Sequence, residues 1–168
     1  MIKKSLLILG FILMSVSGHA LEVGDEAPCV VLEHVQTNGQ ISEHCIREPE
    51  FANKPIVLDF FSIYCRDCIN SFPILNKMAN ETHGMATYRG IAVDRNQDKV
   101  KSFIEKNPEL IIHEVALDSA RVATQAYGIY YTPTVFVIGP DNKILFKHEG
   151  SITDDIAVQI KQTIQSAK

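Results

Sequence analysis

Apolar residues follow two different spacings along this chain, and the two spacings alternate. The run PIVLDFF at 55–61 is apolar except for Asp59, which is typical of a strand buried on both faces of a sheet. Further β-prone runs predict extended segments at 86–94, 110–118, 134–139 and 143–150. Between them, apolar residues recur every three or four positions and predict helices over 66–80, 96–107, 119–127 and 154–166. Pro73 is expected to kink the first of these helices.

The order of these segments sets the expected architecture. Strands and helices alternate through the middle of the chain, and a hairpin and a helix close it. This order predicts an α/β fold in which helices cover both faces of a mixed central β-sheet. The length of 168 residues suggests one domain, and an apolar content of 46% is enough for a real hydrophobic core.

An N-terminal β-hairpin precedes the α/β pattern. The runs CVVLEHV and QISEHC flank Asn38-Gly39, a dipeptide that favours a tight turn because both residues tolerate positive φ. In an ideal two-residue hairpin, Leu32 faces Cys45. Cys29 is then not a direct partner of Cys45, although a bulge or a strand end could bring the two together.

The first 20 residues have the pattern of a secretory signal peptide. Two lysines precede an apolar run from Leu6 to Val16, and small residues occupy the two positions that signal peptidase reads. The run is short for a membrane span, which needs about 20 residues. We therefore expect cleavage after Ala20, a mature domain over 21–168 and a periplasmic location. The alternative is an uncleaved anchor that holds the protein on the inner membrane, facing the periplasm.

Charge and cysteine content narrow the class of protein further. The net charge is −4, so there is no basic excess that would suggest binding to nucleic acid. Export would place the four cysteines in an oxidising compartment. There, a structural disulfide between Cys29 and Cys45 is the favoured use of that pair, ahead of two buried free thiols or a second redox pair.

The stretch FSIYCRDCINSFP places Cys65 and Cys68 in C-x-x-C spacing, directly after the buried strand and at the start of a helix. Unpaired backbone N–H groups at a helix start favour the thiolate form of the first cysteine. Cys65 is therefore expected to attack a substrate, and Cys68 to resolve the mixed disulfide. A zinc site would need further ligands at regular spacing, whereas the six histidines are scattered. We expect redox exchange, with no metal or cofactor.

Three stretches together carry a family resemblance. VLDFFSIYCRDC, YGIYYTPTVFVIGPDNKILFKHEG and the VGDEAP that precedes the hairpin span nearly all of the mature chain. They resemble the thioredoxin superfamily, specifically the periplasmic thiol-disulfide oxidoreductases of the TlpA, ResA and cytochrome-c-maturation type. The resemblance implies a thioredoxin-like fold with an N-terminal extension. It also implies disulfide exchange with protein substrates, in the reducing direction, with a DsbD-type membrane thiol transporter as electron donor.

The resemblance implies roles for single residues as well. Pro133 would be the cis-proline that faces the two cysteines, and the backbone of Thr132 would pair with an extended substrate peptide. Tyr64 stands where the family usually has Trp, and it would contact the substrate. Asp59, six residues before Cys65, would be the buried acid that relays a proton to or from the resolving thiol.

The chain departs from the family's pattern at several positions. Ser71 lies where many ResA-like proteins have Glu, and Gly90 lies where thioredoxin has the lysine beside the buried acid. These changes argue against a ResA-type acid relay and make Asp59 the main candidate. Arg66 favours the thiolate of the first cysteine and Asp67 opposes it, so their charges leave the reduction potential open.

Other functions fit parts of the sequence. An oxidase or isomerase would use the same residues at a higher potential. The VGDEAP start and Ser62 would be consistent with a peroxiredoxin. However, Leu58 occupies the position where a peroxiredoxin is expected to have proline. A copper-delivery module of the Sco type would use C-x-x-x-C, one residue longer than the spacing here, with a distal histidine; His113 is instead expected to be a strand surface residue. A thioredoxin-fold chaperone is a further alternative.

Overall fold

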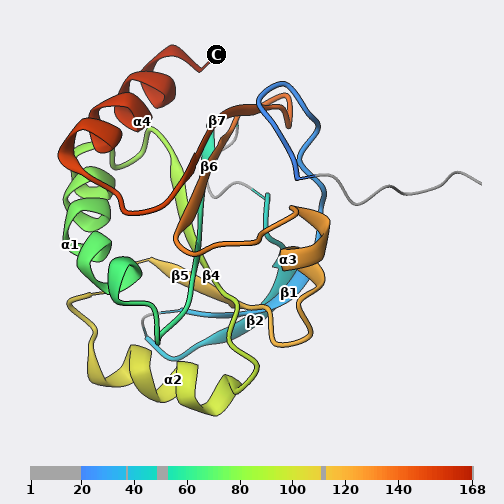
Figure 1. Cartoon of the computed structure of the whole chain (residues 1–168), viewed down its shortest axis with the longest axis vertical. Helices are drawn as coiled ribbons and strands as arrows, with labels where there is room; N and C mark the ends of the chain where they lie inside the picture. Colours follow the sequence, from blue (N-terminus) through green and yellow to red (C-terminus); the bar gives the residue numbers. More distant parts are fainter. Residues whose placement is uncertain (1–19, 37, 49–52, 111–112, 168) are drawn as a thin grey trace, which may run out of the picture.

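The computed structural model describes residues 20–36, 38–48, 53–110 and 113–167, which form one seven-stranded sheet and four helices (Figure 1). The strands are β1 (Val31–Val35), β2 (Ile41–Cys45), β3 (Ile56–Phe61), β4 (Thr87–Ala92), β5 (Glu114–Leu117), β6 (Thr134–Ile138) and β7 (Ile144–Glu149). The helices are α1 (Arg66–Glu81), α2 (Gln97–Lys106), α3 (Val122–Ala126) and α4 (Asp154–Ser166).

The sheet is mixed, with the strand order β2-β1-β5-β4-β3-β6-β7. β3, β4 and β5 run parallel to one another, and every other neighbouring pair is antiparallel. Parallel neighbours need a crossover connection, which α1 provides between β3 and β4 and α2 provides between β4 and β5. β5 is shorter than the predicted segment 110–118, of which 111–112 lie outside the described residues.

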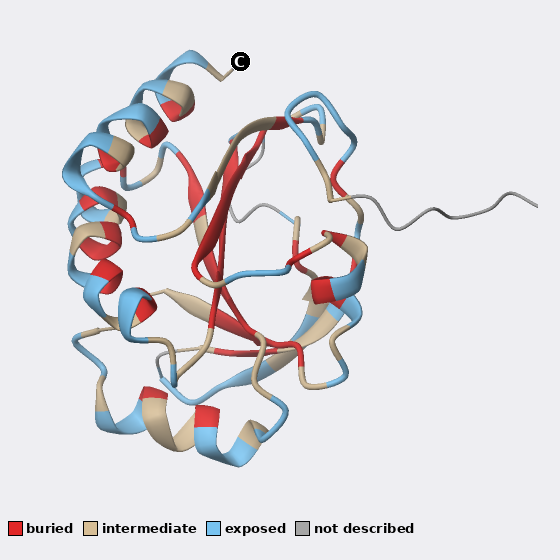
Figure 2. Ribbon diagram, in the orientation of Figure 1, coloured by how far each residue is buried: buried red, intermediate tan, exposed pale blue. Residues whose placement is uncertain are grey.

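Each face of the sheet has its own apolar core (Figure 2). All six residues of β3 are buried, which explains why its sequence is an almost continuous apolar run. Phe61 points to the face that α1 and α4 cover, where its ring meets Phe72 of α1 edge to face. Phe60 points to the opposite face and packs against Tyr127, at the end of α3. Helices therefore cover both faces, and the predicted α/β architecture is confirmed.

Capping residues set the ends of the helices. α4 spans the predicted range 154–166, because the side chain of Thr153 accepts a backbone N–H of the first turn. α1 begins where predicted, continues through Pro73 and ends one residue later than expected. α3 is shorter than the predicted 119–127, since Arg121 precedes it with a left-handed φ of 61°.

The N-terminal hairpin forms, but the predicted register was wrong by one residue. Val31, and not Leu32, pairs with Cys45. The turn is longer than Asn-Gly alone, because the N–H of Gln36 donates to the carbonyl of Gln40 at 2.9 Å. A shift of one residue changes which side chains of the two strands share a face, so the error affects every pair in the hairpin. β1 also pairs with β5, which joins the hairpin to the main sheet.

The segment at 24–27 runs along the edge of β7, at the end where the β6–β7 turn lies. The N–H of Gly24 donates to the carbonyl of Ile144 at 2.8 Å, and the N–H of Ile144 donates to the carbonyl of Asp25 at 2.9 Å. These bonds cover part of an edge strand that would otherwise present unpaired backbone groups.

The predicted signal peptide, residues 1–20, lies outside the described residues except for Ala20. Within the part of the chain that the structure describes, no helix is long and apolar enough to cross a membrane.

Candidate active site

The C-x-x-C pair lies where β3 ends and α1 begins. Cys65 is the N-cap residue of α1, and its Sγ accepts the backbone N–H of Cys68 at 3.1 Å. The two sulfurs form a disulfide, with the Cα atoms 5.3 Å apart. Cys68 is 1% exposed whereas Cys65 is half-buried, so a partner from solution reaches Cys65 first.

Asp94, which follows β4, holds the turn that leads into Cys65. One carboxylate oxygen accepts the hydroxyl of Ser62 at 2.7 Å, and the other accepts the N–H of Ile63 at 2.9 Å. The N–H of Tyr64 then donates to the Ser62 hydroxyl at 3.2 Å. This role of Asp94 was not predicted, although the sequence places an acid at the end of the predicted strand at 86–94.

A second loop approaches the first cysteine from the start of β6. The Thr132–Pro133 peptide bond is cis. The carbonyl oxygen of Thr132 lies 3.4 Å from Cys65 Sγ, and the carbonyl of Pro133 accepts the N–H of Gly150 at 2.8 Å. Thr132 and Pro133 are thus placed beside the cysteine pair, although they are more than 60 residues away in sequence.

Three tyrosines adjoin these two loops and are unusually exposed. Tyr64, directly before Cys65, is 68% exposed, and Tyr130 and Tyr131, directly before Thr132, are 71% and 70% exposed. Exposed aromatic side chains offer a large apolar area with a polar tip to a binding partner. Tyr64 was predicted as a substrate contact, but Tyr130 and Tyr131 were not, although the sequence shows an aromatic pair immediately before Thr-Pro.

Asp59 lies in the middle of β3, two residues from Phe61 and on the same face. It is 4% exposed, and burial raises its pKa to about 7. Its Oδ1 is buried and makes no hydrogen bond with any described residue. An acid in this state exchanges its proton near neutral pH.

Gly90 pairs with Asp59 across β3 and β4, and its lack of a side chain has a steric reason. A Cβ at this position would lie 2.9 Å from Cε1 of Phe61 and 3.5 Å from Nε2 of His113, so a lysine has no room there.

The prediction that His113 is a strand surface residue was wrong. His113 precedes β5 and is half-buried, and its Nδ1 is buried. Burial, and then the charge of Arg89, lower the pKa of His113 to about 4.

The remaining predicted positions lie on the first two turns of α1. Ser71 is 1% exposed; its hydroxyl donates to the carbonyl of Asp67 at 2.7 Å and accepts the N–H of Ile152 at 3.0 Å. It therefore ties α1 to the loop before α4 and has no proton to relay near neutral pH. Arg66 and Asp67 are both exposed, beside the half-buried Cys65.

Cys29 and Cys45 form the second disulfide, with their Cα atoms 5.5 Å apart. Cys29 lies just before β1 and Cys45 is the last residue of β2. They are not directly paired in the hairpin but meet at the end of its strands, as the sequence analysis allowed. The hairpin hydrogen bonds continue past β2, where the N–H of Ile46 donates to the carbonyl of Val30 at 2.9 Å. The disulfide therefore closes the open end of the hairpin.

Replacing both hairpin cysteines by serine is expected to lower the free energy of unfolding by about 3 kcal/mol, because the disulfide closes a loop of roughly 15 residues. Urea unfolding of the oxidised proteins measures the difference. Thiol-disulfide exchange at Cys65 and Cys68 should be unchanged in the double variant. A change in the redox titration of that pair would instead make Cys29 and Cys45 a second redox couple.

Comparison with known proteins adds to this geometry. The thiol-disulfide oxidoreductase ResA of Bacillus subtilis is 27% identical over 139 residues, which cover 82% of this chain and 73% of that protein. Among solved structures, a thiol:disulfide interchange protein DsbE of Chlorobium tepidum has a TM-score of 0.72 at 24% identity, covering 88% of this chain and 98% of the other. A reduced 2-Cys peroxiredoxin of Plasmodium vivax has a TM-score of 0.70 at 17% identity, covering 85% of this chain and 81% of the other.

The fold of these structures is thioredoxin-like, as the resemblance of the sequence implied. The model of the AhpC/TSA family matches residues 23–147, which is most of the chain. The chain therefore belongs to the AhpC/TSA family and has a thioredoxin-like fold.

Proposed function

We propose that the protein is an exported thiol-disulfide oxidoreductase that reduces disulfides of protein substrates through Cys65 and Cys68. The observation that carries the proposal is the difference between the two sulfurs. Cys65 is accessible, caps a helix and contacts the cis-proline loop, whereas Cys68 is buried one turn behind it. A pair of this kind can attack with one sulfur and resolve with the other.

In the reducing direction, the Cys65 thiolate attacks one sulfur of a substrate disulfide. A mixed disulfide forms, and the other substrate sulfur leaves as a thiolate. The Cys68 thiolate then attacks Cys65 Sγ, releases the second substrate thiolate and forms the Cys65–Cys68 disulfide. Two electrons pass from the cysteine pair to the substrate. The N–H of Cys68, 3.1 Å from Cys65 Sγ, supports the attacking thiolate.

Asp59 is the proposed proton acceptor for the resolving step. Cys68 must lose its proton before it attacks, and bulk water has little access to a side chain that is 1% exposed. With its pKa raised to about 7 by burial, Asp59 can accept this proton when ionised and return it later. Asp59 lies in β3, and Cys65 lies at the start of α1, just after β3. The same strand therefore positions the acid and the first cysteine.

Substrate binding is assigned to the two loops that meet at Cys65. Thr132 presents its backbone beside the reactive sulfur, where an extended peptide can add as a strand. Tyr64, Tyr130 and Tyr131 supply exposed aromatic surface around that strand. The binding surface therefore suits an unfolded or locally extended protein segment more than a small molecule.

Location and partner follow from the proposed export. Residues 1–20 would direct the protein to the periplasm, and a DsbD-type membrane thiol transporter would return the pair to the dithiol state. ResA of Bacillus subtilis carries the name thiol-disulfide oxidoreductase, which supports the same chemistry here. Oxidised cysteines of apocytochrome c are one candidate substrate class, and other oxidised periplasmic thiols are another.

A redox titration against glutathione and dithiothreitol, read by thiol alkylation, tests the direction of electron flow. We expect the Cys65–Cys68 couple to lie well below the glutathione couple, where each shift of about 30 mV changes the equilibrium tenfold. A potential clearly above that couple would contradict the reducing direction and identify an oxidase or isomerase. The Cys29→Ser/Cys45→Ser variant keeps the second disulfide out of the signal.

Peroxide reduction is the second candidate function, because the family match and the likeness to a 2-Cys peroxiredoxin both favour it. Against it, the hydroxyl of Ser62 already donates to Asp94, and Leu58 stands where a peroxiredoxin is expected to have proline. Rapid oxidation of the reduced protein by hydrogen peroxide, without exchange with a protein disulfide, would establish this second function in place of the first.

A further inference from the structure

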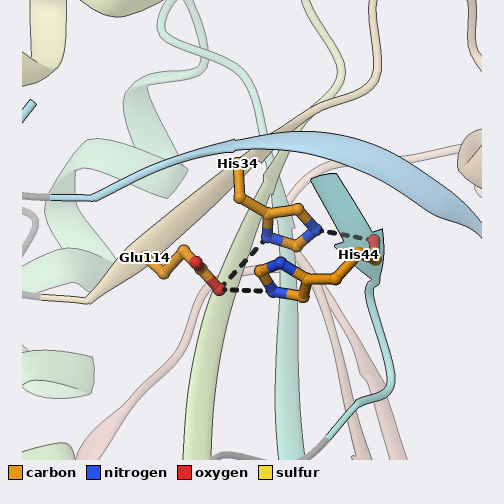
Figure 3. A group of neighbouring side chains, drawn as sticks. All are labelled: His34, His44 and Glu114. Carbon is orange, nitrogen blue, oxygen red and sulfur yellow. Dashed lines mark hydrogen bonds and ion pairs between the residues drawn. The ribbon is translucent and has the colours of Figure 1, made fainter. Parts of the chain in front are cut away.

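Two histidines and a glutamate from three strands come together on the sheet face opposite α1 (Figure 3). His34 lies on β1, His44 on β2 and Glu114 at the start of β5. Glu114 Oε2 lies 3.1 Å from Nδ1 of His34 and 3.1 Å from Nε2 of His44. The two imidazole rings stack with their centroids 3.7 Å apart, so both nitrogens face the same carboxylate.

The cluster is separate from the cysteine pair. Glu114 opens β5 and Arg89 lies near the start of β4, whereas Cys65 follows the end of β3, which runs parallel to both strands. The two sites therefore lie toward opposite ends of the sheet. No metal site was expected, because the histidines are scattered in sequence; the observed pairing of β1 with β2 is what places His34 and His44 on one face.

Hydrogen bonding orients the ring of His34, which is 0% exposed. Nε2 lies 3.1 Å from the carbonyl oxygen of His44, and a carbonyl oxygen only accepts, so Nε2 carries a hydrogen. The second ring nitrogen, Nδ1, is buried and lies 3.1 Å from Glu114 Oε2. It therefore points to the same carboxylate oxygen that Nε2 of His44 faces.

All three groups offer an atom of the kind that binds such metals. Each contributes one imidazole nitrogen or carboxylate oxygen, and these three atoms lie within 4.8 Å of one another.

We propose that His34 Nδ1, His44 Nε2 and a carboxylate oxygen of Glu114 bind one divalent transition-metal ion of the Zn²⁺ or Cu²⁺ type. Two histidines and one carboxylate, with a position left for water, form an established ligand set for such ions. The N–H of His34 that donates to a backbone carbonyl is the arrangement by which metal-binding histidines are oriented. His44 lies on the edge strand and is 23% exposed, so its ring can tilt to share the ion.

Arg89 determines which ions the site can take. Its Nε donates to Glu114 Oε2 at 2.7 Å, and its Nη1 donates to the carbonyl of Ile46 at 2.7 Å. Because the guanidinium balances the carboxylate charge, the site holds no net negative charge to attract a cation. Binding then depends on the bonds to imidazole nitrogen, which favours Cu²⁺ and Zn²⁺ and disfavours Mg²⁺ and Ca²⁺.

Calorimetric titration of the fully oxidised, tag-free protein with Zn²⁺, Cu²⁺, Mg²⁺ and Ca²⁺ tests this site, since disulfide-bonded cysteines do not compete for the ion. We expect one equivalent of Zn²⁺ or Cu²⁺ to bind and neither Mg²⁺ nor Ca²⁺. The His44→Gln variant should weaken binding by at least about tenfold. His148→Gln, which alters a half-buried histidine on β7, is the matched control and should leave binding unchanged.

Nuclear magnetic resonance of the histidine rings provides a second readout that does not depend on a variant that folds. Addition of Zn²⁺ should shift the ring signals of both His34 and His44 and leave those of His148 in place. The proposal is overturned if no ion binds, if His44→Gln binds as tightly as the parent protein, or if only His148 responds. Disulfide exchange at Cys65 and Cys68 should be the same in His44→Gln, so the two sites are tested independently.

Discussion

A Cys65→Ser variant is expected to lose disulfide exchange with protein substrates by on the order of 10³-fold or more. Serine keeps the size of the side chain but cannot form a thiolate at neutral pH. Cys68 cannot replace the lost sulfur, since it is 1% exposed and lies behind the first turn of α1. The rate at which the reduced protein opens a disulfide in a small protein substrate measures this loss.

The Cys68→Ser variant is the matched control, because it removes the other half of the same disulfide. It should still attack through Cys65 and should then accumulate as a mixed disulfide with the substrate, which a non-reducing gel or a mass spectrum detects. If Cys65→Ser forms the mixed disulfide and Cys68→Ser does not, the assigned roles of the two cysteines are reversed.

An Asp59→Asn variant is expected to be more stable than the parent protein at pH 8, by up to about 4 kcal/mol. The pKa of Asp59 is raised from 3.8 to about 7 in the folded state, so the folded state holds the proton more tightly than the unfolded one. This contribution to stability is fully present below pH 4 and is lost as the pH rises through 7. Asparagine does not ionise, so the variant avoids this loss. Urea unfolding at pH 4 and pH 8 measures both limits.

Asp118 provides the control for that experiment, because it is also fully buried but its carboxylate accepts the N–H groups of Ala123 and Thr124 and the hydroxyl of Thr124. Asp118→Asn should lower stability at pH 8, opposite to the expected effect of Asp59→Asn. An equal gain from Asp59→Asn at pH 4 and pH 8 would mean that the charge of Asp59 is not what destabilises the fold.

The same Asp59→Asn variant should slow the resolving step by on the order of 100-fold, since general acid–base catalysis is typically worth that much. In the parent protein the rate should increase as the pH rises through 7 and Asp59 becomes ionised. In the variant this increase should be absent. An unchanged pH profile would assign the proton transfer to solvent.

Segments whose pattern is strong and local could be predicted from the sequence. The continuous apolar run identified β3 as a central strand, and the single acid within it identified Asp59 as buried. The spacing of the apolar residues predicted α4 over 154–166, and in the structure Thr153 caps the start of that helix. The junction of β3 with α1 then placed Cys65 and Cys68 without any knowledge of distant contacts.

The hairpin register could not be predicted, because it is not decided within the hairpin. Asn38-Gly39 favours a turn but is compatible with more than one loop length. The observed register also satisfies the pairing of Glu33 with Leu117 on β5, which is more than 80 residues away in sequence. The predicted register placed His34 and His44 on opposite faces of the hairpin, which concealed the cluster with Glu114.

The surroundings of side chains that pack against distant segments could not be predicted from the sequence either. Gly90 departs from the family's pattern because the rings of Phe61 and His113 occupy the space above it, and those rings come from two other segments. Tyr130 and Tyr131 belong to the loop before β6, which approaches Cys65 through Thr132 by a tertiary contact. Contacts between loops far apart in sequence leave no periodic pattern along the chain.

The bonds between the segment at 24–27 and the start of β7 determine how the molecule would be oriented if its N-terminus stayed in the membrane. Five residues lie between Val16 and Glu22, and the six steps from one to the other span at most about 20 Å when the chain is fully extended. This short tether would join the domain at the β6–β7 turn, whereas Pro133 and Cys65 lie at the other end of β6. An anchored form would therefore point its cysteine pair away from the lipid surface, toward soluble substrates, and a membrane-embedded electron donor would need a domain that reaches out to meet it.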